Sequence, residues 1–148
     1  MSRRTAVAVL SLLGLAVALY LTLYQAKVVH TIWDPFGLGG SEWILRRSPL
    51  VRWLGFPDAA FGVAAYGAEL ALDLFGGRRR WPTLALGGIA VAMAGGGLVL
   101  VVLQGVYGHW CSLCLVSAAA SWGILALLVR DVRAAIVERP DMSGARRG

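Results

Sequence analysis

Residues 109–129 read HWCSLCLVSAAASWGILALLV, a long apolar segment that begins with the only two cysteines of the chain, Cys111 and Cys114. A helix needs about 20 apolar residues to cross the hydrocarbon core of a membrane, so we predict a membrane-spanning helix over about 110–129. At the start of a helix, unpaired backbone N–H groups and the helix dipole favour a thiolate over a thiol. The segment therefore predicts a reactive dithiol at the edge of a membrane.

Three further segments are apolar over a similar length, about 5–24, 57–75 and 82–103. Hydrophobic residues make up 58% of the chain and charged residues 15%, whereas about a quarter of the residues of soluble domains are charged. We therefore predict an all-α membrane protein, a single domain over residues 1–148 built as a bundle of four transmembrane helices. The first apolar segment is too long for a typical signal peptide, and no clear cleavage site follows it.

The arginines predict how the chain is oriented in the membrane. Arg3 and Arg4 precede the first span, residues 78–80 are all arginine, and the tail 130–148 holds five more. By the positive-inside rule, both termini and the 78–80 loop are cytoplasmic, which leaves the loop 26–56 and the cysteine pair at the outer face. The net charge of +6 follows from arginines that flank spans, so it does not indicate a nucleic-acid surface. We expect an integral, multi-pass protein of a bacterial plasma membrane, where the outer side is oxidising.

Two carboxylates interrupt the second span. Glu69 and Asp73 lie four residues apart and therefore share one face of a helix. Asp73 is close to the cytoplasmic end, where we expect it to be solvated, near Arg78 or Arg79. Glu69 is deeper, so we expect it to be protonated or bonded to another span.

The outer loop 26–56 is too apolar for a simple linker. It contains Trp33 and Phe36 in a turn-rich stretch, and residues 41–47, SEWILRR, predict a short helix with Ser41 as its N-cap. Together with Trp43 and Trp53, this composition favours a partly helical lid over the outer mouth of the bundle. The alternative is interfacial anchoring, because tryptophan favours the headgroup region.

Four interpretations of the cysteines differ in what they explain. Buried cysteines in a span are often inert, and a metal site would have only His30 and His109 to add to the thiols. Covalent haem attachment is excluded because Leu115, not histidine, follows the pair. A redox pair explains the spacing, the helix start, the oxidising side and the apolar setting together. We therefore favour catalytic roles for Cys111 and Cys114 and predict no metal.

The arrangement of these residues resembles the vitamin K epoxide reductase family, including its bacterial homologues. The resemblance extends from the first span to the end of the fourth. The matching features are Ser48, the Gly55-Phe56-Pro57 turn, Phe61 with Gly62, Tyr66, and the 110–114 start of the fourth span.

The resemblance implies a four-helix bundle around a quinone, either menaquinone or ubiquinone, that acts as co-substrate. The dithiol reduces the quinone, or an epoxide in some members, and a thioredoxin-like partner then supplies electrons. By position, Cys114 would face the quinone and Cys111 would exchange with the outside thiol. Asp58 stands where a polar side chain bonds a quinone carbonyl, although it could instead N-cap the second span. We expect the quinone to contact Asp58, Phe61, Tyr66, Trp33 and Trp43.

The chain also departs from the family pattern. The first loop of family members normally carries a second cysteine pair that relays electrons, but Trp33 stands at the first such place and Ser41 or Glu42 near the second. Ala118 replaces an aromatic residue, often tyrosine, one turn after the active-site pair. The partner must therefore exchange directly with Cys111.

The leading hypothesis is a membrane thiol-disulfide oxidoreductase that couples the C-x-x-C pair to quinone reduction. The alternative is a non-catalytic membrane module that binds an isoprenoid ligand or a partner protein and keeps the cysteines as structural residues.

Overall fold

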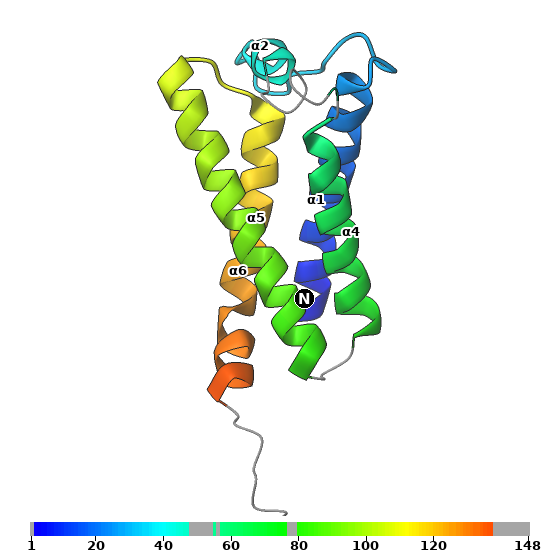
Figure 1. The fold of residues 1–148 in the computed structure, drawn as a ribbon, viewed down its shortest axis with the longest axis vertical. Coiled ribbons are helices and arrows are strands. Elements are labelled where there is room, and N and C mark those ends of the chain that lie inside the picture. Colours follow the sequence, from blue (N-terminus) through cyan, green and yellow to red (C-terminus); the bar gives the residue numbers. More distant parts are fainter. Residues whose placement is uncertain (1, 48–54, 56, 77–79, 138–148) are drawn as a thin grey trace, which may run out of the picture.

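The computed structural model describes residues 2–47, 55, 57–76 and 80–137, and within these residues it is all helical. Four long helices run side by side, and a short one lies across one end (Figure 1). The prediction of an all-α protein is confirmed. The helices are α1 (Arg3–Gln25), α2 (Ser41–Arg46), α4 (Ala59–Phe75), α5 (Arg80–Tyr107) and α6 (Ser112–Val137).

Several residues named from the sequence lie outside the described part of the chain. They are Ser48, Trp53, Phe56, Arg78, Arg79 and the tail beyond Val137.

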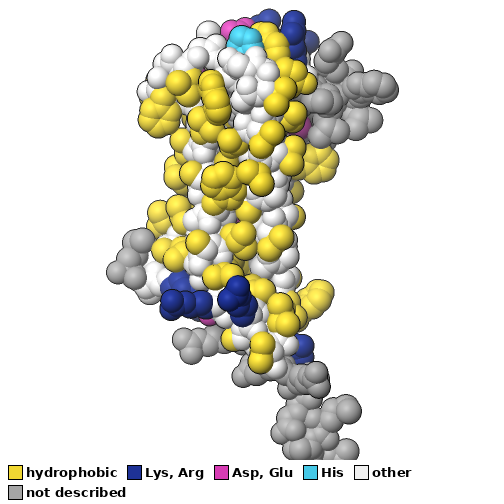
Figure 2. Space-filling view, turned by 90° about the vertical axis from the view of Figure 1, so that its left-hand side faces the viewer, with side chains coloured by type: hydrophobic (Ala, Val, Ile, Leu, Met, Phe, Trp, Pro, Cys, Tyr) yellow, Lys and Arg dark blue, Asp and Glu magenta, His cyan; other side chains and the backbone are white. Residues whose placement is uncertain are grey.

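Three of the described helices, α1, α5 and α6, are long and apolar enough to cross a membrane. Figure 2 shows hydrophobic side chains along the middle of one face, with lysine or arginine side chains at both the upper and the lower end. The prediction of an integral membrane protein is therefore confirmed. Helix α4 has 17 residues, and at 1.5 Å per residue it measures about 25 Å.

Two helices extend beyond their predicted ranges. Helix α5 continues to Tyr107 and α6 to Val137. The sequence estimate stopped at the last strongly apolar residue, whereas backbone hydrogen bonds continue past it. At the far end of α6, Asp131 pairs with Arg3, so this last stretch is held against the start of α1.

Small residues let α1, α4 and α6 approach closely. Gly14 of α1 lies directly against the ring of Tyr66, where a Cβ atom would overlap the ring carbons. The Tyr66 side chain is completely buried. Its hydroxyl lies 2.7 Å from the backbone oxygen of Ser117 and 2.7 Å from Oγ of Ser121. The phenol therefore joins α4 to α6 through the middle of the bundle.

Helices α1 and α4 run antiparallel, and contacts at both of their ends show it. At one end Gln25 receives the backbone N–H of Ala59 at 3.1 Å. At the other, Arg4 donates to the backbone oxygen of Asp73 and lies 3.8 Å from its carboxylate. The described partner of Asp73 is therefore Arg4, because α1 brings its N-terminus to the end of α4.

Glu69 is fully buried. Neither of its carboxylate oxygens has a hydrogen-bond partner among the described residues.

We predict that Gly14→Ala destabilises the protein, because the added methyl group overlaps a tyrosine ring that its hydrogen bonds hold in place. Overpacking of this kind costs about 1–3 kcal/mol. The control is Gly67→Ala on α4, where a Cβ would meet no atom within 4 Å. Thermal unfolding in detergent should show a lower midpoint for Gly14→Ala alone, and equal midpoints would contradict this packing.

Candidate active site

The turn between α5 and α6 is held by Gln104. Helix α5 ends at Tyr107, and the next residue, Gly108, has a φ of +67°, a conformation that glycine adopts more readily than other residues. The backbone oxygen of Gln104 accepts the N–H of His109 at 3.2 Å. Its side-chain Oε1 accepts the N–H of Cys111 at 2.7 Å. One residue thus ends one helix and fixes the backbone just before the next.

Cys111 and Cys114 form a disulfide across the start of α6, with Cα atoms 5.2 Å apart. The Cys111 oxygen accepts the first backbone bond of the helix, from Leu115 at 3.0 Å. Cys111 Sγ lies 3.3 Å from the backbone nitrogen of Cys114, which donates to it. The exposed fraction is 0% for Cys111 and 8% for Cys114. The sulfurs therefore lie at a helix N-terminus, shielded from solvent.

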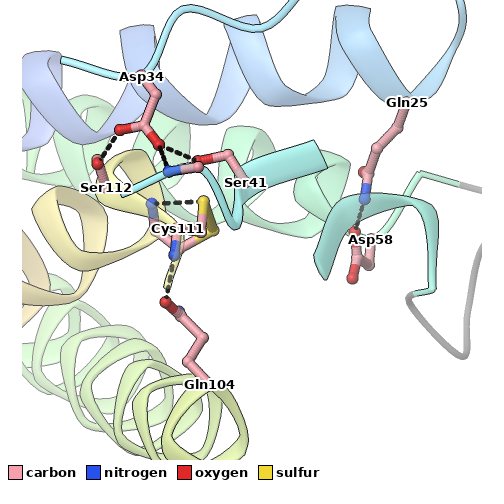
Figure 3. The surroundings of a disulfide bond; sticks show 9 residues. Gln25, Asp34, Ser41, Asp58, Gln104, Cys111 and Ser112 are labelled. Carbon is pink, nitrogen blue, oxygen red and sulfur yellow. Dashed lines mark hydrogen bonds between the residues drawn. A yellow bond between two sulfur atoms is a disulfide. The ribbon is translucent and has the colours of Figure 1, made fainter. Parts of the chain in front are cut away.

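Asp34 connects the loop after α1 to this helix start. Its Oδ1 accepts the hydroxyl of Ser112, the residue that follows Cys111. Its Oδ2 accepts the N–H of Gly39 at 2.8 Å and the hydroxyl of Ser41 at 3.3 Å. Figure 3 shows these groups on one side of the disulfide and Gln104 on the other. The bond from Ser112 is the largest cause of a lowered pKa for Asp34, opposed by desolvation.

The sequence interpretation missed the role of Asp34. An Asp-Pro pair in a turn-rich stretch was the available signal, because aspartate side chains often bond backbone N–H groups in turns. The assignment of Ser41 as an N-cap was wrong. Gly40 occupies that position, since Ser41 turns its hydroxyl to Asp34.

Helix α2 rests on the turn between α5 and α6. A Cβ atom at Gly40 would overlap the backbone of Trp110, so only glycine allows this approach. The ring of Trp43 stacks on His109 with centroids 4.2 Å apart and meets Tyr107 at 5.5 Å. Arg47 lies over the Trp43 ring at 4.5 Å. His109 is therefore part of an aromatic stack, and no group of three potential metal ligands occurs among the described residues.

A cavity of about 770 Å³ lies beside the disulfide and receives lining residues from every described helix. Cys114 lines it, whereas Cys111 is not among its lining residues. The lining is mainly apolar, as in sites that bind small apolar ligands.

The predicted ligand-binding residues occupy different places. Asp58, Phe61 and Trp43 line the cavity. Tyr66 does not line it, but it bonds to Ser117 and Ser121, which do. Trp33 lies outside the lining, and its exposed fraction is 70%.

Asp58 occupies the N-cap position of α4, but its side chain makes no capping bond. Gln25 Nε2 donates to the Asp58 carboxylate. The oxygen of the same Gln25 side chain receives the first backbone N–H of α4. The side-chain capping proposed for Asp58 is therefore done by Gln25.

These features define an all-helical membrane protein with a cysteine pair beside an apolar cavity. A model of the vitamin K epoxide reductase family matches residues 5–129, so the chain belongs to that family. Members of the family are in general membrane thiol oxidoreductases that act on quinones and work with thioredoxin-like partners. No curated protein and no solved structure matches the chain.

We predict that Asp34→Ala exposes the disulfide. Hydrogen bonds to a charged group contribute about 1.5–3 kcal/mol, so their loss should speed reduction by dithiothreitol by about tenfold or more. Alkylation followed on gels measures that rate. The matched control is Glu42→Ala, which removes a carboxylate that pairs with Arg46 at 2.7 Å and leaves the contact with Ser112 intact. Equal rates for both variants would show that Asp34 does not restrict access.

The pH dependence of this contact follows from the lowered pKa of Asp34. A carboxylate with a lowered pKa in the folded state stabilises the fold above its ordinary pKa, here 3.8. That contribution is lost as the pH falls further and the group is protonated. The protection of the disulfide should therefore be constant at neutral pH and decrease only in acid.

Proposed function

We propose that this protein is a membrane thiol-disulfide oxidoreductase in which the Cys111–Cys114 dithiol reduces a quinone. The observation that carries the proposal is that Cys114 lines the apolar cavity, whereas Cys111 is not among its lining residues. In the reaction, the two thiols lose two electrons and two protons and form the S–S bond. The quinone gains them and becomes a quinol, so the reaction balances without a metal.

The proposed quinone site comprises Trp43, Phe61 and Asp58. Tyr66 supports it indirectly, through its hydrogen bonds to Ser117 and Ser121 in the cavity lining. Trp33 is left out because it does not line the cavity. Gly97 lies against Ala118, where a Cβ would approach to 3.2 Å. These small residues leave room for a flat ring, and the cavity accepts the head group of menaquinone or of ubiquinone.

The proposed electron donor is a thioredoxin-like protein that forms a mixed disulfide with Cys111. The chain contains no other cysteine, so no internal relay can carry electrons to the pair. Because Cys111 is fully buried, the residues around it must move before a donor can reach it, and we propose that the segment from Asp34 to Ser41, which is bonded to the adjacent Ser112, makes this movement. This requirement makes that segment, together with α2, a lid over the site.

We also propose that α4 is a fourth span. It runs antiparallel to α1 from Gln25 to Arg4, so it covers most of the length of a helix that itself qualifies as a span. Together with the arginines this favours cytoplasmic termini and a cysteine pair at the outer face of a bacterial plasma membrane.

We predict that quinone oxidises the pair. Reduced protein in detergent, mixed with menadione or ubiquinone-1, should lose two alkylatable thiols and form one equivalent of quinol. The control is Cys111→Ser with Cys114→Ser, which should form no quinol and still fold. Two results together would contradict the proposal: the pair stays reduced with every quinone tried, and cells that carry the double variant behave like the wild type. The protein would then be a binding module with structural cysteines.

We predict that Val28 and Trp81 lie on opposite sides of the membrane. Both side chains are exposed, by 65% and 77%, so cysteines placed there can be labelled. In the cysteine-free background, an impermeant maleimide added to spheroplasts should label Val28→Cys and not Trp81→Cys. Detergent should expose both. Labelling of both variants from the outside would exclude the proposed path of α4.

A further inference from the structure

Gln104 has one half of its side-chain amide engaged and the other half free. Its side chain is almost completely buried, with an exposed fraction of 1%. The oxygen accepts the N–H of Cys111. The nitrogen, Nε2, has no hydrogen-bond partner among the described residues. An unsatisfied buried donor costs about 1–3 kcal/mol, so such a group calls for a partner.

The orientation of this amide is fixed by its neighbour. The backbone N–H of Cys111 is a donor and needs an acceptor, which only the amide oxygen can supply. The NH₂ group must therefore occupy the other position. Gln104 lines the same cavity as Cys114, so the residue that carries the free donor belongs to the wall of that cavity.

Four other polar residues of this cavity already have partners. Ser117 and Ser121 bond to the hydroxyl of Tyr66, and Asp58 accepts from Gln25. Arg47 lies over the ring of Trp43. None of these groups offers what Gln104 offers, a buried neutral donor with no partner among the described residues.

We propose that Gln104 Nε2 donates a hydrogen bond to a carbonyl oxygen of the bound quinone. The inference rests on the proposed function and adds the residue that selects and orients the ligand. An apolar cavity with one neutral donor fits a flat ligand with a neutral acceptor, and a quinone carbonyl is such an acceptor. The same side chain also accepts the backbone N–H of Cys111, so it fixes the position of the quinone carbonyl relative to the cysteine pair.

This bond also assists the reduction. As the quinone gains electrons, negative charge develops on the carbonyl oxygen. A preorganised donor aimed at that oxygen interacts more strongly with the charged state than with the neutral ketone. Gln104 therefore favours electron transfer from the dithiol without giving up a proton itself.

The test compares two ligands of similar shape on the oxidised protein in detergent. Menadione has carbonyls and 2-methylnaphthalene has none. Replacing Gln104 with methionine, Gln104→Met, should weaken menadione binding about tenfold, measured by quenching of tryptophan fluorescence, and should leave 2-methylnaphthalene binding unchanged. Infrared difference spectra should show a lowered carbonyl stretch for menadione in the wild type, and that shift should disappear in the variant. Leu98→Met, on the same helix but outside the cavity lining, is the control and should change neither.

A second variant separates ligand binding from support of the turn. Gln104→Glu keeps an oxygen for the N–H of Cys111. In an assay at about pH 9 the carboxyl group is ionised, so it has no donor for the quinone carbonyl. It should lose menadione affinity as Gln104→Met does. Full affinity and an unchanged carbonyl stretch in either variant would overturn the role of Gln104 while leaving quinone reduction intact. A shift that depends on Gln104, in a protein whose thiols no quinone oxidises, would support this role and overturn the proposed enzyme.

Discussion

The hydrogen bond from the backbone of Cys111 to the side chain of Gln104 determines how the candidate active site is assembled. It links the last turn of α5 to the first residue before α6, and Gly108 makes the reversal possible. Inside an apolar bundle, a backbone N–H without a partner is costly, so the turn has few alternatives. Because the turn is fixed, Cys114 lines the cavity and Cys111 is fully buried.

The second constraint is the attachment of the loop to the helix start. Asp34 receives Ser112 from the C-x-x-C segment and two groups from its own loop. The aromatic stack of Trp43 on His109 adds an apolar contact over the same turn. Cys111, which lies between these two contacts in the sequence, is itself fully buried. A protein without loop cysteines therefore faces a conflict between shielding the disulfide and admitting a reductant, and movement of this loop is the physical solution we favour.

At the opposite end of the bundle, ion pairs hold the helices together. Arg3 pairs with Asp131 and Arg4 with Asp73, which ties α1 to both α6 and α4. Between the two ends, α1 and α4 are in close contact, because Gly14 leaves space for the ring of Tyr66. The bundle is thus held at three levels, and the cavity occupies the space that the small residues of α5 and α6 leave near the cysteine end.

The sequence by itself determined the apolar helices, the membrane location and the cysteine pair at a helix start, because hydropathy and short spacing are local properties. It also located Asp58, Phe61 and Trp43, which line the cavity. It did not reveal Gln104, which directly follows the predicted end of the third span, or the contact of Asp34 with Ser112, 78 positions away. Only the tertiary structure decided these, since such contacts depend on how the helices and the loop pack together.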